Sequence, residues 1–253
     1  MKIRVLAVLI ILLIPVCNNC EVDNDNPKNL TVTDYDENEY KTVQIGNQIW
    51  MAENLKTTHY SDGTVIQVVE NGMEWIALDY SEKAMCYYDN LISNRDEYGA
   101  LYTWAAAMNG SNSSVANPSE VQGVCPDGWH LPSDDEWKEL EMYLGMNPSD
   151  ADMFNFRGAN EGSKLAGDSS LWINGALESD IEFGSSGFNA LPAGYRPPYS
   201  EIYSQLGDIA EFWSSTESGD TLVLTRLLHF YNTRVNRFTF SKKDAHSVRC
   251  IKD

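Results

Sequence analysis

The clearest pattern in the chain is a one-sided apolar stripe at helical spacing, formed by Trp137, Leu140 and Leu144. Ser133 and Glu136 stand three residues apart just before the stripe, as in a capping box, where each side chain binds the other's backbone amide. Gly145 follows the last apolar position and is typical of a helix end. The pattern therefore predicts a helix over residues 133–144.

Other segments give an α+β pattern. Residues 98–108 (YGALYTWAAAM) have helical apolar spacing and predict a second helix earlier in the chain. Residues 43–45 and 48–50 alternate on either side of Gly46-Asn47, which predicts a hairpin. Three further strands are expected at residues 221–230, 235–240 and 247–251. We therefore expect two early helices against an irregular antiparallel sheet.

The N-terminal segment has a pattern of its own. Lys2 and Arg4 precede an unbroken apolar run over residues 5–16. The run is shorter than the roughly 20 residues that a membrane-spanning helix needs. A basic start followed by a short apolar core is typical of a secretory signal peptide. We therefore expect residues 1–16 to direct export.

Two cysteines follow this run. Cys17 stands where the apolar core ends, which resembles the lipidation site of a bacterial lipoprotein signal. Cys20 is followed by acidic residues, which resembles surface-export signals of Bacteroidetes lipoproteins. Cys17 is the favoured lipidation site and Cys20 the alternative; secretion without a lipid is the third interpretation. We expect a bacterial outer-membrane or cell-surface location, with residues 17–38 as an acidic flexible tether and residues 39–253 as the domain.

Charge and motifs exclude several functions. Eighteen Lys and Arg against 37 Asp and Glu give a net charge of −19, which argues against a nucleic-acid partner because such binding needs a basic face. The four histidines do not stand at metal-ligand spacing with one another or with a cysteine, so neither a metal nor another cofactor is expected. Nucleotide-binding and serine-hydrolase motifs are absent from the sequence.

Several phrases together resemble one family. They are residues 41–55 (KTVQIGNQIWMAENL), 86–90 (CYYDN), 98–104 (YGALYTW), 125–137 (CPDGWHLPSDDEW), 186–196 (SGFNALPAGYR), 212–217 (FWSSTE) and 247–250 (SVRC). In this order they resemble the Fibrobacter succinogenes major paralogous domain of exported Bacteroidetes and Fibrobacteres proteins, over about residues 34–253. That family has no assigned reaction. Its phrases are similar to the C-type lectin-like and formylglycine-generating-enzyme superfamily, which implies a C-type lectin-like α+β fold.

The resemblance also implies a disulfide. In the lectin-like fold, cysteines at the positions of Cys125 and Cys250 tie the helical region to the last strand. An exported protein meets an oxidising compartment in which such a bond persists. Cys86 is then left as a buried thiol, with pairing to Cys20 as the alternative. A role for Cys86 as a nucleophile would need a base nearby, and the local sequence supplies none.

Two activities of the related proteins are not expected here. Formylglycine-generating enzymes use a closely spaced pair of copper-binding cysteines, which the folded region of this chain lacks. Calcium-dependent lectins carry Glu-Pro-Asn or Gln-Pro-Asp and Trp-Asn-Asp, where this chain has Arg196-Pro-Pro-Tyr and Trp213-Ser-Ser-Thr. We therefore expect a non-catalytic binding or interaction module for a glycan or a surface protein. The alternatives are a structural cell-surface protein and a hydrolase or oxidase on the same scaffold.

The aromatic residues divide into a predicted core set and a predicted ligand-binding set. The tryptophans of the family phrases are expected in the core: Trp50, Trp104, Trp129, Trp137 and Trp213. Tyr195, Arg196, Tyr199 and Tyr203 lie in a segment interrupted by Gly and Pro, and loops on a rigid scaffold carry binding residues. Aromatic residues and Arg are also enriched at binding hot spots. These four residues are therefore predicted to be exposed and to bind the ligand.

Overall fold

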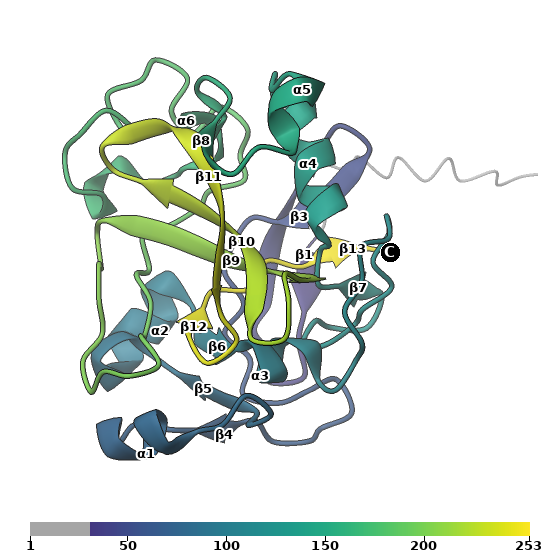
Figure 1. The fold of residues 1–253 in the computed structure, drawn as a ribbon, viewed down its shortest axis with the longest axis vertical. Helices are drawn as coiled ribbons and strands as arrows, with labels where there is room; N and C mark the ends of the chain where they lie inside the picture. Colours follow the sequence, from purple (N-terminus) through teal and green to yellow (C-terminus); the bar gives the residue numbers. More distant parts are fainter. Residues whose placement is uncertain (1–30) are drawn as a thin grey trace, which may run out of the picture.

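The computed structural model describes residues 31–253, which form a mixed α/β fold with three sheets and short helices (Figure 1). The first sheet has the order β1-β2-β3-β13-β7, with all pairs antiparallel. Its strands are β1 (Thr31–Thr33), β2 (Glu39–Ile45), β3 (Gln48–Met51), β13 (Ile251–Lys252) and β7 (Trp129–His130). The tether predicted over residues 17–38 is too long, because β1 pairs with β2 and so belongs to the fold.

The predicted hairpin is confirmed at β2 and β3. Ile45 pairs with Gln48 across the two-residue turn. Gly46 has a φ of 63°, in the left-handed region that glycine adopts without steric cost. A Cβ at this position would also lie 2.8 Å from Cδ2 of Tyr143. The turn therefore requires glycine at position 46.

The second sheet has the order β8-β11-β10-β9 and is antiparallel throughout. Its strands are β8 (Asn155–Arg157), β11 (Asn232–Ser241), β10 (Leu222–His229) and β9 (Ile209–Glu217). The strands predicted at residues 221–230 and 235–240 are confirmed as β10 and β11. Nearly every residue of β9 is buried, as expected for a strand that is covered on both faces.

The third sheet corrects one of the predicted helices. Its order is β12-β6-β5-β4, with β12 (Ala245–His246), β6 (Leu101–Thr103), β5 (Ala84–Cys86) and β4 (Gln67–Val68). The helix predicted over residues 98–108 is wrong. Helix α2 (Ile92–Tyr98) ends at Gly99, whose φ of 83° breaks the helix, and β6 then pairs with β5 before α3 (Trp104–Met108) begins. The strand predicted at residues 247–251 is likewise replaced by β12 and β13.

The helix predicted at the capping box is confirmed as α4 (Asp134–Tyr143). Ser133 accepts from the Glu136 amide, and Glu136 accepts from the Ser133 amide. The remaining helices are short: α1 (Gly72–Ala77), α5 (Pro148–Ala151), α6 (Glu161–Leu165) and the 3-10 turns η2 (Tyr88–Asn90) and η3 (Ser169–Leu171). Within residues 31–253, no helix combines the length and the apolar character that crossing a membrane requires.

The core contains the tryptophans that the sequence placed there. Trp50, Trp104, Trp129, Trp137 and Trp213 are all buried. A disulfide joins Cys125 to Cys250, as the family resemblance implied, and links the loop before β7 to the residue before β13. Cys86 is buried and has no disulfide partner among the described residues. Its alternative partner, Cys20, lies outside them.

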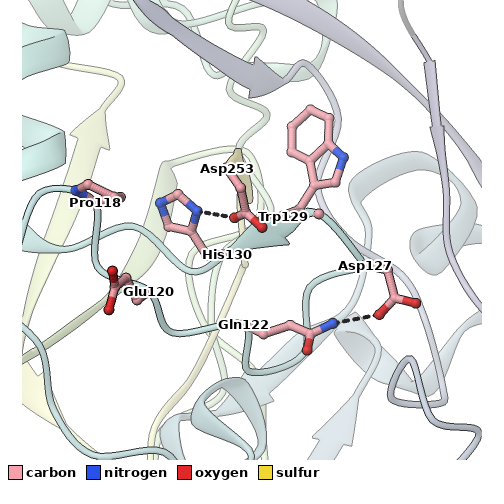
Figure 2. A pocket seen from close by; sticks show the side chains of 8 residues that line it. Pro118, Glu120, Gln122, Asp127, Trp129, His130 and Asp253 are labelled. Carbon is pink, nitrogen blue, oxygen red and sulfur yellow. Dashed lines mark hydrogen bonds and ion pairs between the residues drawn. The ribbon is translucent and has the colours of Figure 1, made fainter.

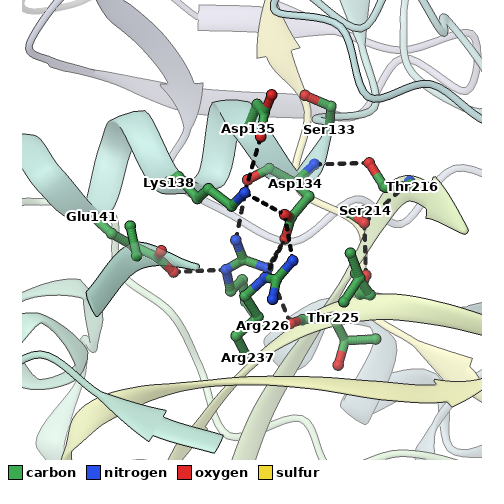
Figure 3. A network of polar contacts seen from close by, with 12 residues as sticks. Ser133, Asp134, Asp135, Lys138, Glu141, Ser214, Thr216, Thr225, Arg226 and Arg237 are labelled. Atoms are coloured by element: carbon green, nitrogen blue, oxygen red, sulfur yellow. Dashed lines mark hydrogen bonds and ion pairs between the residues drawn. The ribbon is translucent and has the colours of Figure 1, made fainter. Parts of the chain in front are cut away.

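A buried ion-pair network docks α4 onto the second sheet (Figure 3). Asp134 accepts from Arg226 Nη1 and from Arg237 Nε and Nη2, each at 2.8 Å. Glu141 accepts from Arg226 Nε at 2.7 Å and from Arg157 Nη2. Burial alone would raise the pKa of Asp134, but the Arg226 and Arg237 guanidiniums hold that pKa well below its usual range. Because every buried charge is paired, this network is structural.

Candidate functional site

A pocket of about 420 Å³ lies where the loop before β7 meets the last residue of the chain (Figure 2). Its lining residues are Pro118, Glu120, Gln122, Asp127, Gly128, Trp129, His130 and Asp253. Strand β7 contributes Trp129 and His130, and its pairing with β13 brings Asp253 to the same edge of the first sheet. The volume falls within the range of about 300–1,000 Å³ that is usual for ligand pockets.

His130 forms the polar centre of one wall. Its Nε2 lies 2.7 Å from Glu136 Oε1 and its Nδ1 lies 2.7 Å from Asp253 Oδ1. Burial lowers the pKa of His130, but the hydrogen bonds and charges of Glu136 and Asp253 outweigh it and leave the pKa raised. When the ring is protonated, both nitrogens donate. Each nitrogen would have to give up its hydrogen bond to a carboxylate before it could act as a base or bind a metal.

The rest of the pocket presents acceptors beside an aromatic wall. Gln122 Nε2 donates to Asp127 Oδ1 at 2.8 Å, which fixes both side chains (Figure 2). Glu120 is exposed and has a φ of 58°, a conformation that is uncommon outside glycine and concentrates at functional sites. Trp129 lines the pocket but is mostly buried. This combination suits a ligand that carries hydroxyl groups on an apolar frame.

The predicted ligand-binding residues do not line this pocket, and Arg196 is not exposed at all. Its guanidinium carbon lies 4.5 Å from the Trp75 ring centroid and 4.8 Å from that of Tyr203. Nη1 donates to the Val69 carbonyl at 2.6 Å. The expectation of an exposed Arg196 is wrong, because the guanidinium is stacked between two rings and hydrogen-bonded to backbone.

The three tyrosines of the same segment divide between core and surface. Tyr203 is only 9% exposed and donates to Asn90 Oδ1 at 2.5 Å, so its predicted exposure is also wrong. Tyr195 is half-buried, and its ring stacks on His246 at 5.6 Å. Tyr199 is 69% exposed. Of the four residues, Tyr199 is the most exposed; ligand binding by this segment stays a prediction.

The sequence reasoning missed Glu120, Gln122 and Asp127 as candidate site residues. Asp127 stood inside the phrase at residues 125–137, but nothing in that phrase distinguished a pocket residue from a turn residue. Glu120 and Gln122 precede the phrase and match no catalytic motif. The pocket forms only when β13 pairs with β7, across more than 100 residues of chain. Local sequence patterns carry no signal for such a contact.

A second pair of titratable side chains lies inside the domain. Glu211 and His246 are fully buried, with 3.3 Å between Oε2 and Nδ1. Burial, together with the charge of Asp244, raises the pKa of Glu211 well above its usual value, and burial lowers the pKa of His246 to about 3. Burial therefore disfavours the charged form of both groups. Among residues 31–253, no group of three or more His, Cys, Asp or Glu side chains is placed to hold a metal ion.

Comparison with known proteins gives one family. The family model described as Fibrobacter succinogenes major domain matches residues 43–252. The match includes both cysteines of the disulfide and all of the pocket except Asp253. Neither the curated proteins nor the solved structures gave a match. The two candidate lipidation residues, Cys17 and Cys20, lie outside the described part of the chain.

Proposed function

From the premise that the chain belongs to the Fibrobacter succinogenes major domain family, we propose that it is an extracytoplasmic lipoprotein with a non-catalytic binding domain. The basic start and apolar run of residues 1–16 support export, and Cys17, with Cys20 as the alternative, supports a lipid anchor. The anchor places the protein at the bacterial outer membrane or cell surface. The domain then meets its ligand outside the cytoplasm.

The pocket at Trp129 carries the binding part of the proposal. Its lining groups are carboxylates, one amide, one indole and an imidazole with both nitrogens engaged. Sugar hydroxyls donate to carboxylates such as Glu120 and Asp127, while Trp129 adds apolar surface for the C–H groups of a sugar ring. A glycan is therefore the favoured ligand. The engaged imidazole favours binding over acid–base catalysis, because a general base needs a free nitrogen.

The order of elements supports a C-type lectin-like arrangement as the finer description of the fold. Helix α3 precedes Cys125, α4 follows it, and the irregular second sheet comes next. Cys250 then returns to Cys125 and closes the domain. A shared arrangement does not by itself assign a ligand, so the proposal of binding depends on the pocket and not on the fold.

A glycan array with the domain tests the binding proposal. Wild type should retain a subset of glycans, and the double variant Glu120→Gln/Asp127→Asn should lose them, because each substitution removes the carboxylate charge and replaces one acceptor oxygen by an NH2 donor. Glu182→Gln is the matched control, since Glu182 is an exposed carboxylate in the loop after η3. If no glycan binds, or if the double variant binds as wild type does, this pocket is not a glycan site.

Metabolic labelling tests the anchor separately. In a bacterial host, the full chain should incorporate labelled palmitate and sediment with membranes. Cys17→Ser should abolish both results, whereas Cys20→Ser should leave them intact. The reverse outcome would move the lipid to Cys20. A wild-type protein that is soluble and unlabelled would overturn the lipoprotein assignment.

A further inference from the structure

A second pocket of about 280 Å³ lies away from the first, between residues 80–83 and the end of β11. Its apolar floor comes from α3 and consists of Trp104, Ala105 and Met108. Lys83 and Lys242 stand at its rim. The volume is just below the roughly 300 Å³ at which pockets for drug-sized ligands begin, so it suits a single ring.

The lysines of this pocket differ in how they are held. Lys242 Nζ lies 4.7 Å from the Trp104 ring centroid and 2.5 Å from Glu217 Oε1. Lys83 Nζ donates to Asn109 Oδ1 at 2.8 Å, and it forms no ion pair with a carboxylate anywhere in the described part of the chain. Lys83 is thus a fixed cation whose charge is not neutralised by direct contact.

Exposed aromatic rings extend this surface beyond the pocket. Lys243 Nζ lies 5.8 Å from the Tyr80 ring centroid and 5.2 Å from that of Tyr199. Both rings are open to solvent, with Tyr80 40% and Tyr199 69% exposed. Residues that the sequence separates widely therefore form one lysine- and tyrosine-bearing surface. Lys243 also has no carboxylate partner within ion-pair distance among residues 31–253.

The lysines of this surface would attract an anionic ligand, and the negative charge of the whole molecule limits how large that ligand can be. A net charge of −19 repels a polyanion along its length. A small monoanion is affected mainly by charges within the Debye length, about 8 Å at physiological salt. The nearest acidic group is Glu217, which pairs with Lys242; Asp62 and Asp79, both exposed, interact with Lys83 and Lys243 through their charges. Lys83 and Lys243 are therefore the cations of this surface that attract a ligand with one negative charge, because neither contacts a carboxylate of the described chain.

We propose that this surface binds a small carboxylate on a sugar-like ring, with a uronic acid as the representative ligand. The carboxylate accepts from Lys83, and the ring packs on the floor formed by α3 and against Tyr80. This site is separate from the pocket at Trp129. Its existence does not depend on the function proposed for that pocket.

Calorimetric titration of the protein with glucuronate, and with glucose as the neutral analogue, tests the proposal. Glucuronate should bind. Glucose should bind at least about tenfold more weakly, because it has no carboxylate to accept a hydrogen bond from the Lys83 ammonium. Lys83→Gln should weaken glucuronate binding by about tenfold for the same reason. Lys41→Gln is the matched control, since Lys41 is exposed on β2, and it should change nothing.

Three results would overturn the proposal. Glucuronate could fail to bind at millimolar concentration, it could bind no better than glucose, or Lys83→Gln could bind it as wild type does. The variant Glu120→Gln/Asp127→Asn separates the two pockets. It should leave glucuronate binding intact, and a loss of binding there would assign the ligand to the first pocket instead.

Discussion

Buried guanidinium groups hold together much of the polar interior of this domain. Arg157, Arg196, Arg226 and Arg249 are among the largest fully buried side chains. Arg226 pairs with two carboxylates, whereas Arg249 donates to Asn54 Oδ1 and to backbone carbonyls. Burial lowers the pKa of Arg249 to about 9. The planar fork of five donors suits such bridging, which explains why these arginines lie inside and the exposed cations are mainly lysines.

Two tyrosines of one segment should respond oppositely to truncation. Tyr203→Ala removes a buried ring that stacks with Tyr88 and Arg196, and it should lower the unfolding free energy by about 3 kcal/mol. Tyr199→Ala removes an exposed ring and should stay within about 0.5 kcal/mol of wild type. Urea unfolding at neutral pH measures both values. Equal losses, or a stable Tyr203→Ala protein, would contradict the burial assigned here.

At the scale of elements, local signals predicted α4 and the β2–β3 hairpin, because each is specified by neighbouring residues. The capping box and Gly46-Asn47 act within a few positions of the chain. The helix predicted over residues 98–108 was wrong because the apolar spacing and the position of Gly99 indicate different structures. Apolar spacing favours a helix, but Gly99 interrupts it and Tyr102 is held in β6 by pairing with Met85, a contact that helical spacing does not encode.

His130 connects α4 to the last strand, and its contribution to stability should depend on pH. Its pKa is raised in the folded state, because Glu136 and Asp253 outweigh burial. Below the unfolded value of about 6.5 both states hold the proton and the stabilisation is complete. As pH rises through the folded pKa, the proton and the stabilisation are lost. His130→Gln should therefore destabilise the protein more at pH 5.5 than at pH 9.

His229→Gln is the control for this measurement. Burial lowers the pKa of His229, so in wild type this residue opposes folding at low pH and not at high pH. The stability of His229→Gln relative to wild type should consequently improve as pH falls, opposite in sign to His130→Gln. Urea unfolding at a series of pH values gives both slopes. A His130→Gln deficit that is constant with pH would mean that folding leaves the pKa of His130 unchanged, and one that grows with pH would mean that folding lowers it; either result contradicts the raised pKa.

At the scale of the whole molecule, residues 245–252 join the three sheets. Strand β12 pairs with β6 in the third sheet, Ser247 forms a bridge with Phe212 of β9 in the second, and β13 lies between β3 and β7 in the first. The same segment carries Asp253 to the pocket at Trp129. The pairings of β12 with β6 and of β13 with β3 and β7 join residues more than 100 positions apart. Single-sequence patterns therefore predicted β10, β11 and the β2–β3 hairpin, but not β6, β12 or the pocket that their assembly creates.

The Cys125–Cys250 disulfide ties this terminal segment to the rest of the chain, so its loss should weaken the whole domain. The two cysteines are 125 residues apart, and closing a loop of that length should stabilise the fold by about 4–5 kcal/mol in the chain-entropy model. Cys125→Ser/Cys250→Ser should lower the unfolding free energy by up to that amount. Dithiothreitol should lower it similarly in wild type and in the control Cys86→Ala, yet leave the double variant unchanged. A non-reduced digest that joins Cys86 to either partner would contradict this pairing, because Cys86 is the buried free thiol of the described chain.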